Sequence, residues 1–294
     1  YKDQAIWFLN GFWGDGINAK EADQVWIFVK KFVELENLGP HRRGEEGNEL
    51  DQFWSAKFLE DFNTALTAIQ RKEALRTIDQ DNNGMMSCLE YLTWRYKKSV
   101  DEVVKAPQGD NRAAIEAAQK KLDAVQAQLR DCEQKIANNE AALKELKVAE
   151  AELTAAYAEL KAQEDALNKK KEELKAKAAG AGVAGARAKN ELAQLEGEDP
   201  LPLRKAKLTQ EAALRRVNKQ KTACEVAKEQ LEAAYAELEQ RMAEARAELD
   251  SVKAKSGGGK GAIWWMEREL FEADWRLPQA KRRYDHSKPF SFDP

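Results

Sequence analysis

The sequence predicts an all-α protein, with a helical domain, a long antiparallel helical hairpin or coiled coil, and a short C-terminal helix. Charged residues make up 34% of the chain, which is typical of long solvated helices. All eight tryptophans lie outside residues 101–256, where the only aromatic residues are Tyr157 and Tyr235. Large aromatic side chains fill wide cores, so we expect a compact helical domain at 1–100, a long rod with a narrow seam at 110–255 and a short aromatic segment at 261–294.

Composition excludes several classes of function. Lys and Arg number 48 against 51 Asp and Glu, and the resulting net charge of -3 argues against wholesale nucleic-acid binding. No stretch approaches the roughly 20 apolar residues of a membrane span. Three cysteines, Cys88, Cys132 and Cys224, fit a reducing, cytoplasmic compartment better than a disulfide framework. The chain starts without Met, so we expect further residues upstream.

Catalytic motifs are also missing from the sequence. Only two histidines occur, His41 and His286, which leaves little basis for a zinc site or a histidine general base. We find neither a glycine-rich phosphate loop nor a nucleophile motif. The chain is therefore predicted not to be an enzyme.

The N-terminal domain is expected to contain five helices. Amphipathic patterns and turn residues place them at residues 4–13, 19–38, 49–62, 64–78 and 87–98. On the second of these helices, Val25, Phe28 and Phe32 share one face.

Residues 79–90, DQDNNGMMSCLE, carry the motif with the clearest chemistry. They match D-x-[DN]-x-[DN]-G-x5-E, the calcium loop of an EF-hand, at every required position. Calcium prefers six to eight hard oxygen ligands, and Gly84 allows the sharp turn between them. The expected oxygens come from side chains, from the carbonyl of residue 85 and through water at residue 87; the ligand set is Asp79, Asp81, Asn83, Met85, Ser87 and Glu90. We therefore predict Ca²⁺ as the bound ion.

EF-hands normally pair, and the expected partner is the helix–loop–helix of residues 19–62. Its loop, GPHRRGEEGNEL at 39–50, contains acidic residues but lacks the calcium pattern. We expect this loop to be degenerate and structural.

The rod shows two heptad seams, the pattern of a coiled coil. In the first arm the repeating residues are Ile115, Leu122, Leu129, Ile136 and Leu143, with Val125, Cys132, Leu146, Leu153, Leu160, Leu167 and Leu174 three residues on. In the second arm they are Leu214, Tyr235, Met242 and Leu249, with Val217, Cys224, Leu231, Leu238, Ala245 and Val252. Polar residues interrupt the seams at Asn139, Glu150, Glu164, Lys221 and Lys228.

The segment between the arms is rich in helix breakers, with a turn expected near 180–202. Gly180, Gly182 and Gly185 should end the first arm, residues 190–195 could form a short helix, and Pro200 fits a loop. An antiparallel hairpin of one chain is favoured, as a monomer or weak dimer. The alternative is a parallel dimer of the whole chain.

A basic patch follows this turn. Residues 201–221 carry seven basic residues and one acid, a local charge of +6. The patch is either one solvated face of a coiled coil or a docking surface for an acidic partner. Its six proposed contact residues are Arg204, Lys205, Lys207, Arg215, Arg216 and Lys219. A second basic cluster lies in the C-terminal tail, and we expect the apolar segment around Trp264 to pack back on the N-terminal domain or the base of the rod.

Six segments make the chain resemble the calcium-regulated actin-bundling proteins of motile protists. They are AIWFLNGFW (5–13), GNELDQFW (47–54), DQDNNGMMSCLEYL (79–92), RAKNELAQLEG (187–197), AALRRV (212–217) and GAIWWMEREL (261–270). The resemblance implies a cytoskeletal protein that cross-links filamentous actin, is inhibited by calcium and binds actin most strongly through roughly 183–256. The alternative is a calcium-sensing coiled-coil scaffold for a non-actin cytoskeletal or membrane-surface partner.

Overall fold

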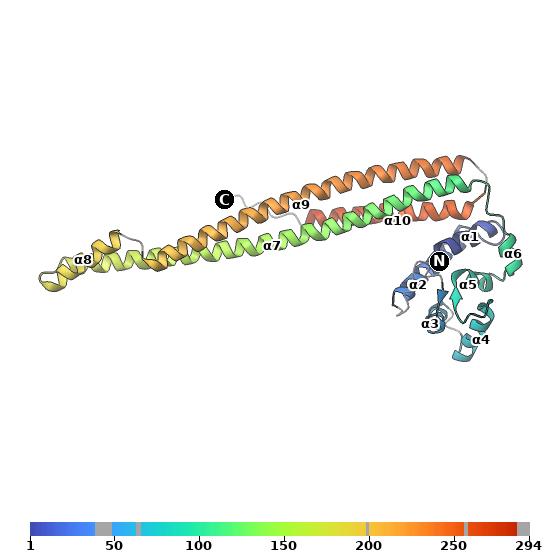
Figure 1. The fold of residues 1–294 in the computed structure, drawn as a ribbon, viewed down its shortest axis with the longest axis horizontal. Helices are drawn as coiled ribbons and strands as arrows, with labels where there is room; N and C mark the ends of the chain where they lie inside the picture. Colours follow the sequence, from blue (N-terminus) through green and yellow to red (C-terminus); the bar gives the residue numbers. More distant parts are fainter. Residues whose placement is uncertain (39–48, 63–65, 198–199, 256–257, 287–294) are drawn as a thin grey trace. The chain divides into compact units, whose positions relative to one another are not determined.

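The computed structural model describes residues 1–38, 49–62, 66–197, 200–255 and 258–286, with side chains up to residue 276. Helices dominate these residues, which confirms the predicted all-α class (Figure 1). The chain forms two compact units. Unit 1 contains residues 1–127 and 239–276, and unit 2 contains 128–238 together with 277–294. Both long helices of the rod contribute to both units.

In the N-terminal part of unit 1, the described residues form six helices and one two-stranded sheet. The elements are α1 Lys2–Phe12, α2 Ala19–Leu38, β1 Glu49–Leu50, α3 Gln52–Phe62, α4 Ala68–Ile78, β2 Met86–Ser87, α5 Cys88–Arg95 and α6 Val100–Lys105. The five predicted helices are all present, whereas α6 was not predicted. Its start is fixed by a capping box in which Ser99 and Glu102 satisfy each other's backbone N–H groups.

Aromatic side chains form the core of this part. Phe28 and Phe32 of α2 meet Tyr91 of α5 with ring centroids 5.1 and 6.3 Å apart, and Phe58 of α3 lies 4.3 Å from Phe32. These four rings are at most 2% exposed. The aromatic residues that distinguish this region from the rod in the sequence therefore form its core. They pack α2, which precedes the partner loop, against α5, which follows the 79–90 loop.

The rod consists of α7 Arg112–Ala178 and α9 Leu201–Ala254. In unit 2, Arg216 forms an ion pair with Glu152 at 2.6 Å, and Gln220 donates a hydrogen bond to Glu145 at 3.0 Å. The residue number rises along one helix as it falls along the other, so the two helices are antiparallel. This confirms the hairpin, and Figure 1 shows the two ribbons side by side.

The observed seam differs from the predicted heptads at several polar positions. Asn139 is buried as expected, but Glu150 and Lys221 are exposed. Ala149 takes the place of Glu150 in a cluster with Leu146 and Val217. Leu214 is 39% exposed, and Lys228 is also exposed. Charged side chains are costly to bury, so the seam shifts by one residue to place small neighbours inside.

The turn between the arms contains a complete helix, α8 Val183–Gly197. Gly182, at φ 93°, makes the turn, while Gly185 lies inside α8 instead of ending the first arm. A Cβ atom on Gly185 would overlap the carbonyl oxygen of Gly180, so this position requires glycine for close packing. The short helix expected at 190–195 is therefore longer and starts earlier.

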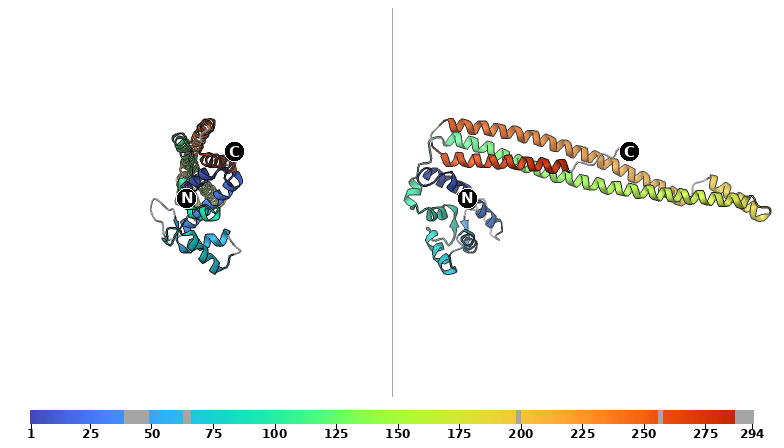
Figure 2. Two further views of the ribbon diagram at one scale, coloured as in Figure 1. Left: turned by 90° about the vertical axis from the view of Figure 1, so that its right-hand side faces the viewer. Right: turned by 180° about the vertical axis from the view of Figure 1, so that it is seen from behind.

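The last helix is α10 Lys260–His286, and its part up to residue 276 packs within unit 1, as expected for the segment around Trp264. Trp265 is 2% exposed and its ring centroid lies 4.5 Å from that of Trp26 in α2. Ion pairs join α10 to α1, α2 and α9; they are Lys2–Glu269, Lys30–Glu272, Asp23–Arg268, Arg246–Asp274 and Lys253–Glu267. Figure 2 shows α10 beside the unit 1 ends of α7 and α9.

No helix in the described part of the chain has both the length and the apolar character of a membrane span.

Candidate calcium site

The candidate loop lies between two well-defined helix ends. A capping box at Thr67 starts α4, and Asp79 follows its last residue as the C-cap. A second capping box, formed by Ser87 and Glu90, starts α5. Helix-capping chemistry thus fixes both ends of the loop, and the first and last predicted ligands belong to these caps.

The backbone of the loop is folded around the first two aspartates. Asn82 and Gly84 have positive φ angles of 58° and 80°, which turn the chain sharply. The backbone N–H of Asn83 donates to both Asp79 and Asp81 at 3.0 Å, and that of Gly84 donates to Asp79 at 2.9 Å. These bonds hold the carboxylates of Asp79 and Asp81 on the inside of the turn.

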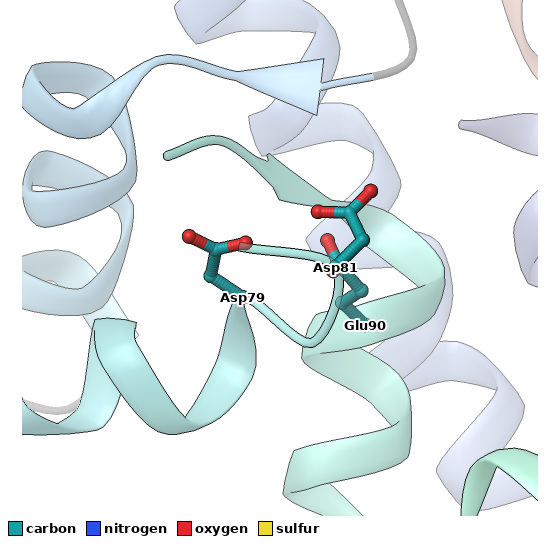
Figure 3. A group of neighbouring side chains, drawn as sticks. All are labelled: Asp79, Asp81 and Glu90. Carbon is teal, nitrogen blue, oxygen red and sulfur yellow. The ribbon is translucent and has the colours of Figure 1, made fainter. Parts of the chain in front are cut away.

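Three carboxylates converge on this turn. One oxygen each from Asp79, Asp81 and Glu90 lies within 4.8 Å of the others (Figure 3). Asp79 and Glu90 are partly buried, and Asp81 is exposed. A cluster of hard, anionic oxygens is the ligand chemistry that Ca²⁺ prefers. The residues present therefore fit a calcium ion.

Glu90 and Ser87 also form hydrogen bonds that cap the N-terminus of α5. One carboxylate oxygen of Glu90 accepts from the backbone N–H of Gln80 at 2.9 Å, and the other accepts from both the N–H and the hydroxyl of Ser87 at 2.9 Å. The Ser87 oxygen in turn accepts from the N–H of Glu90. Nearby, the N–H of Met85 donates to Asn83 at 2.7 Å.

The sheet fixes how the partner loop aligns with this one. Leu50 pairs with Met86 in an antiparallel ladder, and each residue precedes its exit helix by two positions. Leu50 thus aligns with the eighth position of the 79–90 loop, and by this register the last position of the partner loop is residue 54 and not the expected residue 50. Residues 39–48 lie outside the described part of the chain.

This register explains why the partner loop is expected not to bind an ion. Asp51 accepts from the N–H of Trp54 at 2.9 Å, just as Ser87 accepts from the N–H of Glu90. Trp54 therefore occupies the position equivalent to Glu90 and offers no carboxylate. The sequence pattern alone placed the frame differently and missed this substitution.

The six predicted actin-contact residues all lie on α9 and are exposed. Arg216 contacts Glu152 of α7, and Arg215 lies 3.6 Å from Glu211 one helical turn away. The remaining four, Arg204, Lys205, Lys207 and Lys219, are likewise on the solvent-facing side. Arg216 thus joins α9 to α7, and all six side chains of the basic patch are exposed.

Sequence reasoning missed the contacts made by α1. The side chain of Gln4 accepts a hydrogen bond from the N–H of Leu89 at 3.1 Å, one residue before Glu90. Lys2, on the same helix, forms an ion pair with Glu269 of α10 at 2.7 Å. Neither residue belongs to a motif, so only the folded structure reveals that α1 touches both the calcium loop's exit helix and α10.

Comparisons with known proteins agree with the resemblance seen in the sequence. Residues 113–254 match the family model described as F actin bundling C terminal. The chain is 28% identical to the "Calcium-regulated actin-bundling protein" of Dictyostelium discoideum over 96% of this chain and 86% of that protein. The fold is similar to the crystal structure of the 34 kDa F-actin bundling protein from the same organism, with a TM-score of 0.50, 23% identity and coverage of 94% and 92% of the two chains.

Proposed function

Because the chain resembles the calcium-regulated actin-bundling proteins in sequence and fold, we propose that it cross-links actin filaments into bundles and that calcium inhibits this activity. The observation that carries the proposal is the combination, in one chain, of the family's C-terminal region with a complete calcium loop at 79–90. The proposed setting is the cytoplasm, at the actin cytoskeleton.

The proposed calcium ligands are Asp79, Asp81, Asn83, the carbonyl of Met85, Ser87 through water, and Glu90. Convergence of three carboxylates supports this set. A bound calcium ion would supply positive charge that holds these oxygens together. Since both oxygens of Glu90 are hydrogen-bonded to Gln80 and Ser87, their use as ligands would rearrange the N-terminal turn of α5.

The proposed filament contact is the basic patch of α9, formed by Arg204, Lys205, Lys207, Arg215, Arg216 and Lys219. Actin is an acidic polymer, so exposed positive charge favours the encounter. Bundling requires at least two filament contacts per molecule or per oligomer. We place the second, weaker contact on the N-terminal helices, in a protein that is a monomer or weak dimer.

Helix α1 offers a route from the calcium loop to α10. Gln4 contacts the backbone of Leu89, and Lys2 contacts Glu269 of α10. A change at the start of α5 would alter the hydrogen bond between Gln4 and Leu89. Because Lys2 lies half a turn from Gln4 on α1, a shift of α1 would also alter the contact between Lys2 and α10. Calcium can shift the arrangement of α5, α1 and α10 only if it binds the two arrangements with different affinity.

The test is co-sedimentation with actin filaments at low and high centrifugal force, with calcium or with chelator. We expect the chain to pellet bundles in chelator and to lose most of this activity in calcium. A Glu90→Gln variant should keep bundling in calcium, because the closing ligand loses its charge. Calcium inhibition that persists in this variant would exclude control through the loop.

An absence of pelleting in chelator would exclude actin cross-linking itself. In that case, calcium binding by the intact chain would favour the scaffold with a non-actin partner.

A further inference from the structure

A side chain from the degenerate half of the EF-hand pair contacts the calcium loop. Both carboxylate oxygens of Glu49, on β1, lie 3.2 Å from the side-chain nitrogen of Asn83. Glu49 reaches this position because β1 pairs with β2, where it lies opposite Ser87. The contact joins two segments 34 residues apart in sequence.

The two ends of the Asn83 amide have different partners. Its nitrogen donates to Asp81 at 3.0 Å and to Glu49, whereas its oxygen accepts from the N–H of Met85 at 2.7 Å. An amide nitrogen only donates and an amide oxygen only accepts. Two carboxylates at the nitrogen therefore fix the orientation of the amide, and its oxygen, next to the N–H of Met85, is the end of the amide that could accept a cation.

Glu49 itself is not part of the convergent carboxylate cluster, which consists of Asp79, Asp81 and Glu90 among the described residues. It lies outside these three and touches the loop through Asn83. The charge of Glu49 also disfavours an aspartate at position 83, because the carboxylates of residues 49 and 83 would then be in contact. Like charges at such a distance repel.

We propose that Glu49 is a positioning residue for the calcium loop, which orients Asn83 as a ligand and disfavours a fourth acid in the loop. The half of the pair with Trp54 in place of a closing glutamate would thus still set the calcium affinity of its neighbour. This inference rests on the proposed calcium site at 79–90.

The first test is isothermal titration of the full chain with calcium chloride. We expect Glu49→Ala to weaken calcium binding by roughly tenfold, the range typical for groups that orient a metal ligand. Glu49→Gln retains an acceptor for Asn83 and should lose less affinity than Glu49→Ala. The matched controls are Glu60→Ala and Glu60→Gln, at an exposed acid that pairs with Lys57 on α3; these should bind as the unmodified chain does.

The second test separates orientation from a general structural role. Asn83→Asp should gain little affinity in the unmodified chain but clearly more in a Glu49→Gln background, where the opposing charge is gone. Thermal unfolding in chelator should be the same for Glu49→Gln and Glu60→Gln. An equal effect of Asn83→Asp in both backgrounds would overturn the inference even if Glu49→Ala fails to fold.

The outcomes also separate this inference from the proposed function. If the unmodified chain binds calcium and the Glu49 and Glu60 variants bind equally well, only the role of Glu49 is excluded. If the unmodified chain gives no calcium signal, the calcium site and the role of Glu49 are both excluded.

Discussion

Burial of single side chains sets the reactivity of the three cysteines. Cys88 is fully buried in the aromatic core, and burial raises the pKa of its thiol to about 12. Cys132 lies in the seam of α7, where burial raises its pKa to about 11. Cys224 is partly exposed, and its pKa is raised by partial burial and by the nearby charge of Glu150. Each cysteine therefore acts as a small apolar residue.

We expect iodoacetamide at pH 8 to label Cys224 first, Cys132 next and Cys88 last in the folded chain. The thiolate is the reactive form, and a raised pKa lowers its fraction at any pH below that pKa. For Cys132, labelling should rise about tenfold per pH unit until the pH approaches 11. Peptide mass spectrometry measures the extent of labelling at each cysteine, and unfolding in guanidinium should make the three labelling rates equal. Equal labelling of Cys88 and Cys224 in the folded chain would contradict this account.

At the scale of elements, α10 is held by close packing at its first turn. A Cβ atom on Gly261 would lie 2.5 Å from the backbone nitrogen of Asn10 and from the carbonyl carbon of Leu9. The side-chain oxygen of Asn10 also accepts from the N–H of Ala262 at 2.8 Å. Because the Asn10 nitrogen and the Leu9 carbon belong to the backbone of α1, they have little freedom to move aside.

Gly261→Ala should therefore destabilise unit 1 by about 1–3 kcal/mol, the usual cost of overpacking. Helix propensity alone would favour alanine by roughly 1 kcal/mol, so the sign of the change reports the steric contact. The matched control is Gly197→Ala in α8, where a Cβ atom meets nothing within 4 Å. Denaturant unfolding of both variants measures the difference. A stabilised Gly261→Ala chain would show that α10 does not approach α1 this closely.

The seam of the hairpin contains a second element-scale feature, the buried Asn139, which is 4% exposed. Burying an amide costs roughly 1–3 kcal/mol by mutational estimates when it lacks full compensation. Asn139→Leu should therefore stabilise unit 2, while Asn138→Leu at the exposed neighbouring position should change stability by less than about 0.5 kcal/mol. Thermal unfolding tests this, and equal shifts for the two variants would contradict it.

At the scale of the whole molecule, both long helices are shared between the two units. Residues 112–127 of α7 and 239–254 of α9 belong to unit 1 with α10 up to residue 276, and the rest of both arms, with the turn between them, belongs to unit 2. The basic patch and the calcium loop thus lie in different units, connected by continuous helix. The proposed regulation requires both units in one chain.

This arrangement gives a prediction for filament binding. Replacing Arg204 and Lys205 by glutamate should weaken actin co-sedimentation several-fold and reduce its salt dependence, because two exposed positive charges on α9 become negative. The control is Lys144→Glu with Lys147→Glu on α7, an exposed pair outside the patch. Filament binding should be nearly unchanged in the control. Equal losses in both double variants would indicate a nonspecific charge effect.

The fold was predictable from periodicity, and the candidate calcium loop was proposed from a motif whose residues are contiguous. Heptads identified the arms, and the aromatic residues identified the compact region. The features that were missed depend on partners distant in sequence. From the sequence, Gly185 is predicted to end a helix, and only the structure shows that it packs against Gly180. Similarly, Glu49 is one of several acids in the partner loop, and only the strand pairing shows that it contacts Asn83.

Trp54, in the place that Glu90 fills in the other loop, has a consequence for how steeply the protein can respond. With one ligand-bearing loop among the described residues, each chain is expected to follow a simple saturation curve with a Hill coefficient of one. Going from a tenth to nine-tenths occupancy then takes about an eighty-fold rise in free calcium. Filament cross-linking by such a chain would change gradually over a broad range of free calcium. Any sharper calcium threshold in the cell would have to come from the fact that many molecules act together in one bundle.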